Sequence, residues 1–382
     1  MGGLQDESFK KHPPFISIDT VSLIADFITE GCKALNIENV SIGFHGGEPM
    51  MQKLHEFETM CSLLVGKITQ HANLNFTMQS NGMLINNAWI NALVKYRVHL
   101  GISLDGNKEE NDKHRVDKRN RGTYDRVLQG INRLKSSQYM DVMKGVGLLT
   151  VINPESNPEK TYYHFTQEIG VSDIDFLLPD ITHDQKNSLD AKKYGDYLVR
   201  LFNVWINDQT DVRIRIMKSS LDALTGGTSS IYGFGYNSPH ILPLITISSD
   251  GSIWPVDELR VTAAFHKNRP KNVRDLSLTE FLSTDLIKEI RYASETPPEN
   301  CMTCCWKQVC FGGNLVSRYS AKNGFNNQSL YCAGLKDFYA TLSASLLESG
   351  YPYQKIIENL KDRNCYDKKY LHKRCENHST II

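Results

Sequence analysis

The stretch VSIGFHGGEP, residues 40–49, joins a short apolar run to two glycines and a proline. A run rich in β-branched and aromatic residues that ends in such a turn is typical of a buried strand in a parallel sheet. The glycines allow the backbone to come close to a ligand, and Pro49 suits the start of a following helix. A Gly-Gly pair after a strand is a plain turn at least as often as it is part of a ligand site. The stretch therefore indicates a site only together with similar patterns elsewhere in the chain.

A strand-like run followed by a helical stretch recurs from residue 40 to residue 207. This alternation predicts βαβ units with right-handed crossovers, and therefore an α/β fold with a parallel sheet. The expected strands are 40–44, 74–79, 99–104, 145–151 and 173–178, with a further one at 212–217. The expected helices are 54–70, 87–95, 123–136, 158–169 and 192–207.

A helix at 20–35, with Asp19 or Thr20 as its N-cap, is expected before the first of these strands. A leading helix is unusual in this architecture and suggests that one β element is missing from the front. Later in the chain the alternation ends, and residues 244–257 predict a β-hairpin. A helix at about 334–348 is expected next, followed by a polar tail that frays.

Composition excludes several classes of function. The 382 residues are 40% hydrophobic and 23% charged, which is ordinary for a soluble globular protein. Lys+Arg and Asp+Glu number 43 each, so no net charge attracts nucleic acid or an anionic membrane. The first thirty residues lack a signal-peptide pattern, and no apolar run is long enough to span a bilayer. We expect a cytoplasmic protein with no nucleic-acid partner and no membrane partner.

Polar residues and glycines stand at the carboxyl ends of successive expected strands. Gln-Ser-Asn-Gly (79–82) follows the second strand, while Ser103 and then Asp105-Gly106 follow the third. Turn chemistry explains each of them singly. Because parallel α/β folds build their ligand sites at the carboxyl ends of strands, the combination predicts one pocket. Arg115, in the charged loop after the third strand, is on this evidence a solvated cation.

The cysteines predict a metal site. Nine cysteines, an odd number concentrated toward the C-terminus, fit metal-binding thiols better than a secreted disulfide framework. Four of them have the spacing C-x2-C-x5-C-x21-C, namely Cys301, Cys304, Cys310 and Cys332. A zinc site of four cysteines usually repeats a tight knuckle in both halves, and the second knuckle is absent. Unevenly spaced thiolates suit a [4Fe–4S] cluster, so the spacing favours iron–sulfur and leaves zinc open.

Gly46-Gly47-Glu48-Pro49, the strand end at 79–82 and the segment ISLDG…ND..R (102–115) together resemble the core of the radical S-adenosylmethionine (SAM) enzymes, a partial (β/α)6 barrel. CMTCCWKQVC…C resembles the SPASM/twitch extension, which carries auxiliary iron–sulfur clusters. Residues 310–338 are most similar to the peptide maturases that form cyclophanes in ribosomally made peptides. The resemblance implies a partial barrel lacking its first strand at 1–217, a SPASM/twitch-like cluster domain at 218–350 and a polar tail at 351–382.

The resemblance also implies SAM as a cofactor. The residues that would bind its amino group, ribose and methionine parts are Gly46, Gly47, Glu48, Pro49, Ser80, Asn81 and Ser103. Arg115 matches a family arginine that pairs with the methionine carboxylate, for which a guanidinium fork is suited. Reductive cleavage of SAM, with electrons from a donor of the flavodoxin or ferredoxin type, gives a 5′-deoxyadenosyl radical that takes hydrogen from a peptide.

This sequence departs from the family pattern in two places. Val256 and Asn314 stand where a complete SPASM domain has cysteines, so we expect one auxiliary [4Fe–4S] cluster, with Asp257 as a catalytic acid nearby. Its expected ligands are Cys301, Cys304, Cys310 and Cys332. The family's C-x3-C-x2-C loop has no counterpart, because no cysteine precedes Cys32, which lies in an expected helix. We therefore expect the SAM-binding [4Fe–4S] cluster only in a longer form, whether the start was assigned too late or the gene is a remnant.

By family, these features predict an enzyme that crosslinks an aromatic side chain to an aliphatic carbon of a nearby residue in a precursor peptide. The 382 residues as given are expected to be inactive, because they lack the cysteines of the SAM-cleaving cluster. An alternative is an enzyme of the sulfatase-maturing kind, which oxidises Cys or Ser to formylglycine, although its members usually carry the complete cysteine set. A third interpretation is a catalytically dead peptide-binding scaffold with a structural zinc site. Metal analysis after anaerobic purification separates the scaffold from the enzymes.

Overall fold

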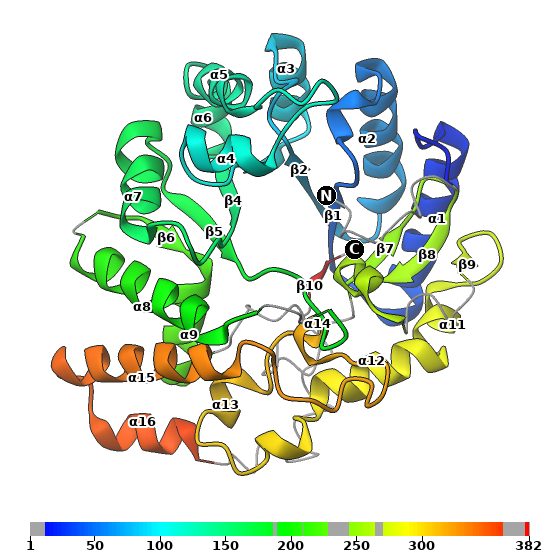
Figure 1. Cartoon of the computed structure of the whole chain (residues 1–382). Helices are drawn as coiled ribbons and strands as arrows, with labels where there is room; N and C mark the ends of the chain where they lie inside the picture. The colour runs from blue at the N-terminus through cyan, green and yellow to red at the C-terminus, as the bar shows by residue number, and fades with distance from the viewer. Residues whose placement is uncertain are drawn as a thin grey trace.

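The computed structural model describes residues 12–185, 189–208, 210–227, 244–263, 270–361 and 379–381. A parallel sheet of order β10-β1-β2-β3-β4-β5-β6 curves through the centre, and helices cover its outside (Figure 1). Its strands are β1 (Asn39–Phe44), β2 (Asn73–Ser80), β3 (Val98–Ser103), β4 (Gly147–Val151), β5 (Asp173–Leu177), β6 (Arg213–Ile214) and β10 (Ser379–Ile381). The predicted α/β fold is confirmed, and the predicted strands follow one another across the sheet in chain order.

The helices of the barrel lie close to their expected ranges. They are α1 (Ile18–Leu35), α2 (Leu54–Ile68), α3 (Asn87–Lys95), α4 (Lys108–His114), α5 (Tyr124–Lys135), α6 (Gln138–Met143), α7 (Pro158–Tyr163), α8 (Ala191–Asn207) and α9 (Arg215–Leu224), with the short helices η2 (Pro49–Met51) and η3 (His164–Ile169). The expected N-caps of the first helix were wrong. Ser17 is extended and its side chain accepts a hydrogen bond from the Thr20 amide, so α1 begins at Ile18.

Two edges of the sheet differ from expectation. The expected strand at 212–217 is only two residues long, because Ile216 and Met217 are buried as part of α9. At the opposite edge, Ser379–Ile381 of the tail pairs in parallel with residues 39–41 of β1. A strand from the tail, which we expected to fray, therefore lies beside β1, where the sequence suggested a missing β element.

The C-terminal part is built around a small antiparallel sheet, as the hairpin pattern predicted. Its strands are β7 (Ile245–Ile247), β8 (Ser252–Pro255) and β9 (Lys271–Asn272). Its helices are η4 (Asp257–Val261), α11 (Leu278–Leu282), α12 (Asp285–Glu295), η5 (Glu299–Cys301), α13 (Lys307–Cys310), α14 (Leu315–Arg318), α15 (Cys332–Glu348) and α16 (Tyr353–Leu360). None of the helices in the described ranges is long and apolar enough to cross a membrane.

Helix α15 packs directly on α8 of the barrel through a pair of buried glycines. A Cβ atom added at Gly334 would overlap the backbone of Ala191 and Gly195, and one added at Gly195 would overlap Gly334. Leu335, Phe338 and Leu342 of α15 accordingly belong to the same hydrophobic core as the strands of the sheet. This close contact fixes the start of α15, and with it Cys332, against the barrel.

Replacing Gly334 by alanine is expected to destabilise the protein by about 1–3 kcal/mol, because the added methyl group must push the two backbones apart. Urea unfolding measures the change. The matched control is Gly66→Ala in α2, where a Cβ atom meets nothing within 4 Å. That substitution is expected to be neutral or to stabilise the helix by about 0.5–1 kcal/mol. Equal stabilities of the two variants would show that the contact between α8 and α15 is loose.

Candidate functional site

The glycine-rich segment after β1 leaves open space at the end of that strand. Gly46 has a φ of +113°, and a Cβ atom added at Gly46 or Gly47 would meet nothing within 4 Å. Because no side chain covers the backbone here, a ligand can approach the main-chain atoms closely. This end of the sheet is where parallel α/β folds bind their ligands.

The Glu48 side chain ties the end of β1 to the end of β2. Its carboxylate accepts hydrogen bonds from Ser80 Oγ at 2.8 Å, from the Asn81 amide at 2.7 Å and from the Met50 amide at 3.1 Å. Ser80 is buried, and its hydroxyl also accepts from the Gly82 amide at 3.0 Å. The three predicted residues Glu48, Ser80 and Asn81 thus lie together, held by one carboxylate whose role the sequence did not reveal.

Arg115 is not the solvated loop cation that its sequence context suggested. Its Nε and Nη2 atoms donate to the two carboxylate oxygens of Asp105, at 2.5 and 3.1 Å, and its side chain is only 11% exposed. Asp105 also accepts from the Val151 amide at the end of β4, at 2.9 Å. Arg115 therefore lies at the carboxyl ends of β3 and β4, close to Ser103, the last residue of β3. Its pairing with the methionine carboxylate of SAM stays a prediction.

An acidic group from the C-terminal part faces the same end of the barrel. Asp257 Oδ2 lies 3.7 Å from Nδ1 of His45, the residue directly before Gly46. Asp180 and Glu258 lie in electrostatic range of Asp257. Burial, together with the nearby charges of Glu258 and Asp257, raises the pKa of Asp180 to about 7. Sequence analysis named only Asp257. Glu258 is its neighbour in sequence, whereas Asp180 comes near it only through the fold.

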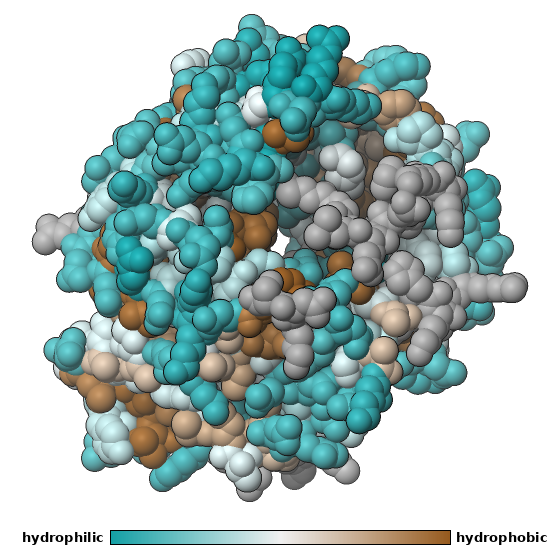
Figure 2. All heavy atoms as spheres, viewed as in Figure 1, coloured by the Kyte–Doolittle hydropathy of each residue, from teal (hydrophilic) through white to brown (hydrophobic). Residues whose placement is uncertain are grey.

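Glu258 links this acidic group to the cysteine-containing segment. Its Oε2 atom accepts a hydrogen bond from Asn314 Nδ2 at 3.0 Å, and burial raises its pKa above the usual value. Figure 2 shows that hydrophilic residues cover most of this face of the molecule and that its centre is hollowed. Carboxylates in such a partly enclosed space can accept protons near neutral pH.

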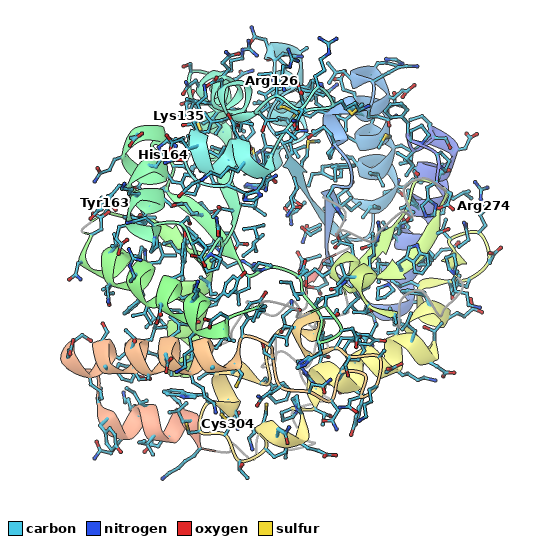
Figure 3. All side chains as sticks on the ribbon, in the orientation of Figure 1. Arg126, Lys135, Tyr163, His164, Arg274 and Cys304 are labelled. Carbon is cyan, nitrogen blue, oxygen red and sulfur yellow. The ribbon has the colours of Figure 1, made fainter. Side chains whose placement is uncertain are left out.

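The four predicted metal ligands meet at one pocket, in the lower part of the view where Cys304 is labelled (Figure 3). They are Cys301, Cys304, Cys310 and Cys332. Burial, together with the neighbouring Cys332 and Cys301, raises the pKa of the Cys310 thiol to about 12. Cys305 is exposed and does not line the pocket. Cys32 and Cys61 are buried core residues in α1 and α2, as the sequence predicted.

The charges around this pocket fit an anionic group. Lys307 and Lys336 line it, and no Asp or Glu does so in the described part of the chain. Among the described residues, no three His, Cys, Asp or Glu side chains are placed to share one metal ion. An iron–sulfur cluster distributes its cysteine ligands over separate iron atoms. Four thiols that surround one pocket, next to cationic side chains, fit a [4Fe–4S] cluster.

The residues that the structure describes near the barrel end do not form a second cluster site. The sequence contains no C-x3-C-x2-C motif. Of the described thiols, Cys32 and Cys61 are packed inside helices α1 and α2. The open backbone at Gly46 and Gly47 fits SAM, whereas the thiols that the structure describes do not provide the three ligands of a SAM-cleaving cluster.

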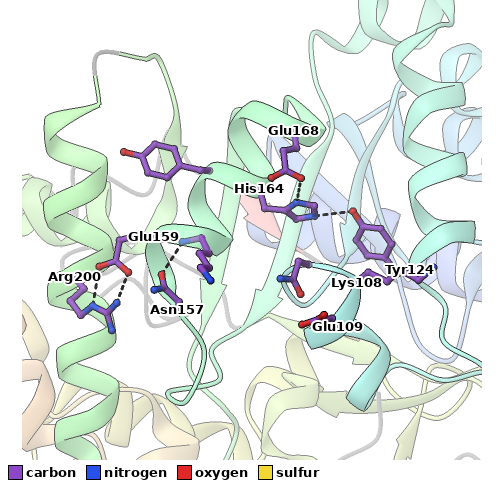
Figure 4. A pocket seen from close by; sticks show the side chains of 11 residues that line it. Lys108, Glu109, Tyr124, Asn157, Glu159, His164, Glu168 and Arg200 are labelled. Carbon is purple, nitrogen blue, oxygen red and sulfur yellow. Dashed lines mark hydrogen bonds and ion pairs between the residues drawn. The ribbon is translucent and has the colours of Figure 1, made fainter.

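A further cavity of about 840 Å³ lies on the outside of the barrel, between α4, α5, α7, η3 and α8 (Figure 4). Buried His164 shares hydrogen bonds of 2.8 Å with the Tyr124 hydroxyl and with the Glu168 carboxylate. Arg200 donates to both oxygens of the Glu159 carboxylate. The bonds of His164 to Tyr124 and of Arg200 to Glu159 join neighbouring helices. These polar side chains are therefore paired with one another, and the cavity needs no ligand to explain them. No sequence motif indicated it.

The structure therefore combines a curved parallel α/β sheet, an open glycine-rich strand end and a pocket lined by four cysteines. Residues 12–163 match the model of the Radical SAM superfamily. This match agrees with the resemblance of the same segment to the radical SAM core.

Several relatives with similar sequences are described as enzymes. The chain is 25% identical over 319 residues to the cysteine-type anaerobic sulfatase-maturating enzyme of Clostridium novyi (strain NT), covering 79% of this chain and 80% of that protein. It is 26% identical over 338 residues to the enzyme of the same description from Clostridium perfringens (strain ATCC 13124), covering 85% and 88%. The serine-type enzyme of Klebsiella pneumoniae is 23% identical over 327 residues, covering 84% and 78%.

Solved structures share the fold. The chain matches native anSMEcpe with bound AdoMet and Cp18Cys peptide with a TM-score of 0.75 at 24% identity, covering 87% of this chain and 91% of that one. It matches Streptococcus suis SuiB bound to the precursor peptide SuiA with a TM-score of 0.50 at 15% identity, covering 81% and 69%. The likeness extends beyond residues 12–163, so the C-terminal part belongs to the shared architecture.

Proposed function

We propose that this protein is of the radical SAM maturase type that forms a carbon–carbon crosslink, a cyclophane, in a ribosomally made precursor peptide. Its SAM cleavage would require a [4Fe–4S] cluster whose three ligands the thiols described near the barrel end do not provide. The observation that carries the proposal is the contact between Asp257 and His45, because it brings an acid of the cysteine-containing part to the glycine-rich strand end. Two of the matching structures contain a bound peptide, which supports a peptide as the substrate class.

The barrel end would bind the cofactor. The residues that we assign to SAM are Gly46, Gly47, Glu48, Pro49, Ser80, Asn81, Ser103 and Arg115. Glu48 would act chiefly by holding the ends of β1 and β2 in place, since Ser80 and Asn81 donate to it. SAM, when cleaved reductively, supplies a radical that removes a hydrogen atom from the substrate. The electrons would come from a flavodoxin- or ferredoxin-type donor.

Forming the crosslink breaks two C–H bonds and makes one C–C bond, so the peptide loses two protons and two electrons overall. The radical would remove one hydrogen atom, and Asp257 would accept the remaining proton, because its carboxylate lies 3.7 Å from His45 beside the strand end. Cys301, Cys304, Cys310 and Cys332 would hold the auxiliary [4Fe–4S] cluster, whose chemistry is one-electron transfer.

Formylglycine formation is the second candidate, and the sequence relatives favour it, because they are described as sulfatase-maturating enzymes of the cysteine and serine types. Val256 and Asn314 favour the crosslink instead, since they occupy positions where the complete SPASM pattern has cysteines. The two products differ chemically. Formylglycine is an aldehyde, whereas a crosslink leaves no new carbonyl group.

The products can therefore be separated by one experiment. The gene is expressed from its own locus without oxygen, and peptides encoded by short neighbouring reading frames are analysed by mass spectrometry with and without a hydrazide probe. The proposal predicts a peptide that has lost two hydrogen atoms, does not react with hydrazide and gives fragments joined between an aromatic and an aliphatic residue. A hydrazide-reactive residue in place of cysteine or serine would establish the second candidate.

A further inference from the structure

Arg318 is a buried cation, and no described residue forms an ion pair with it. Its side chain is 2% exposed, and it is the largest fully buried side chain among the described residues. Its nitrogens donate only to backbone carbonyls, with Nε 3.1 Å from Phe325 O, Nη1 2.9 Å from Ala293 O and Nη2 3.2 Å from Thr296 O. Taking a charge out of water without an opposite charge is costly, so this position calls for an anion nearby.

The four-cysteine pocket lies next to this guanidinium. A Cβ atom added at Gly312, which lines the pocket, would be 3.5 Å from Arg318 Cδ. The thiols of Cys301 and Cys310 are in electrostatic range of Arg318. Lys307 and Lys336 on the pocket wall add positive charge. The pocket thus has cationic groups on several sides.

We propose that Arg318 is the fixed counter-charge of the auxiliary [4Fe–4S] cluster, and that it raises the reduction potential of that cluster. This inference rests on the cluster assigned under the proposed function. Four thiolates give the cluster a net negative charge, and reduction by one electron from a flavodoxin- or ferredoxin-type donor makes that charge one unit more negative. A nearby positive charge stabilises the reduced form more than the oxidised form, most strongly in an interior of low dielectric constant.

A raised potential serves the proposed reaction, because it makes the cluster a better acceptor for an electron that the peptide loses. The guanidinium suits this role better than a lysine would. It directs its donors at three carbonyls in a fixed plane, so its charge stays in one place relative to the pocket. Arg318 is therefore a positioning residue that acts through the cluster without touching the substrate.

The test is a redox titration of the anaerobically purified and reconstituted 382-residue chain, followed by electron paramagnetic resonance of the reduced cluster. Arg318→Met is expected to lower the midpoint potential, so that the ratio of reduced to oxidised cluster at a fixed potential falls by at least about tenfold. Arg318→Lys keeps the charge and is expected to stay near the wild type. The control is Arg274→Met, which removes an exposed cation that lies far from Cys304 in Figure 3.

An unchanged midpoint potential in Arg318→Met overturns the inference. If Arg318→Met fails to hold iron, Arg318→Lys decides: iron content restored by the lysine charge supports the inference, and equal loss of iron in both variants contradicts it. The proposed cluster itself is judged beforehand on the wild-type chain. Wild-type protein that holds zinc or no metal would contradict the cluster assignment. A cluster whose midpoint potential does not change in Arg318→Met would contradict only the role of Arg318.

Discussion

Replacing Cys304 by alanine is expected to remove most of the iron from the purified protein. Cys304 lines the pocket together with Cys301, Cys310 and Cys332, so its loss leaves one iron atom of the proposed cluster without a protein ligand. Thiolate ligands are the main bonds between such a cluster and the chain, so the effect should be large. Iron and sulfide per chain, together with the visible absorption of the cluster, measure it.

The neighbouring residue provides a matched control. Cys305 is also a cysteine and is adjacent in sequence, yet it is exposed and does not line the pocket. Cys305→Ala is therefore expected to keep the full iron content. If Cys304→Ala kept its iron while Cys305→Ala lost it, the ligand assignment would be wrong by one residue. Full iron in both variants would mean that neither thiol binds the cluster.

Replacing Asp257 by asparagine is expected to lower crosslink formation by about 100-fold or more, the range in which general bases contribute to catalysis. The amide has nearly the same shape as the carboxylate but cannot accept the proton that leaves the peptide. Iron content and SAM affinity should stay at the wild-type level, because Asp257 is not among the assigned ligands of the cluster or of SAM. The yield of crosslinked peptide, measured on protein expressed from its own locus, gives the effect.

The control for this prediction is Asp275→Asn, an exposed aspartate in the same part of the chain. It removes the same charge without touching the barrel end, and it is expected to leave the yield unchanged. Normal crosslinking in Asp257→Asn would exclude Asp257 as the proton acceptor. A parallel loss of iron would instead show that the substitution acts on the structure.

The fold could be predicted from the sequence where local pattern and tertiary packing agree. Helix α3 has the expected bounds, Asn87–Lys95, because Asn86 caps it and its apolar positions share one face. The helix expected at 158–169 instead divides into α7 and the π-helical turn η3, whose backbone spacing no local sequence signal indicated. Strand β10 could not be foreseen either, because it pairs with a strand more than three hundred residues away in sequence. The domain boundaries after residues 217 and 350 stay predictions.

The candidate site shows the same division. Sequence motifs located the glycine-rich strand end and the four cysteines, because both sites are formed largely by residues close together in sequence. The carboxylate bond from Glu48 to Ser80 and the pairing of Arg115 with Asp105 depend on how neighbouring loops meet. Arg318 stands in the quoted C-terminal segment, yet nothing in the sequence distinguishes a buried arginine from an exposed one. One of its carbonyl partners, Phe325, lies in the same segment, and the other two, Ala293 and Thr296, lie at the end of α12.

The central claim is that the four cysteines hold iron beside a barrel end shaped for SAM. The most direct measurement is the iron, acid-labile sulfide and zinc content of the 382-residue chain purified without oxygen. We expect about four iron and four sulfide ions per chain, as a [4Fe–4S] cluster requires, with little zinc. One zinc ion per chain without iron or sulfide would contradict the account and support a structural scaffold.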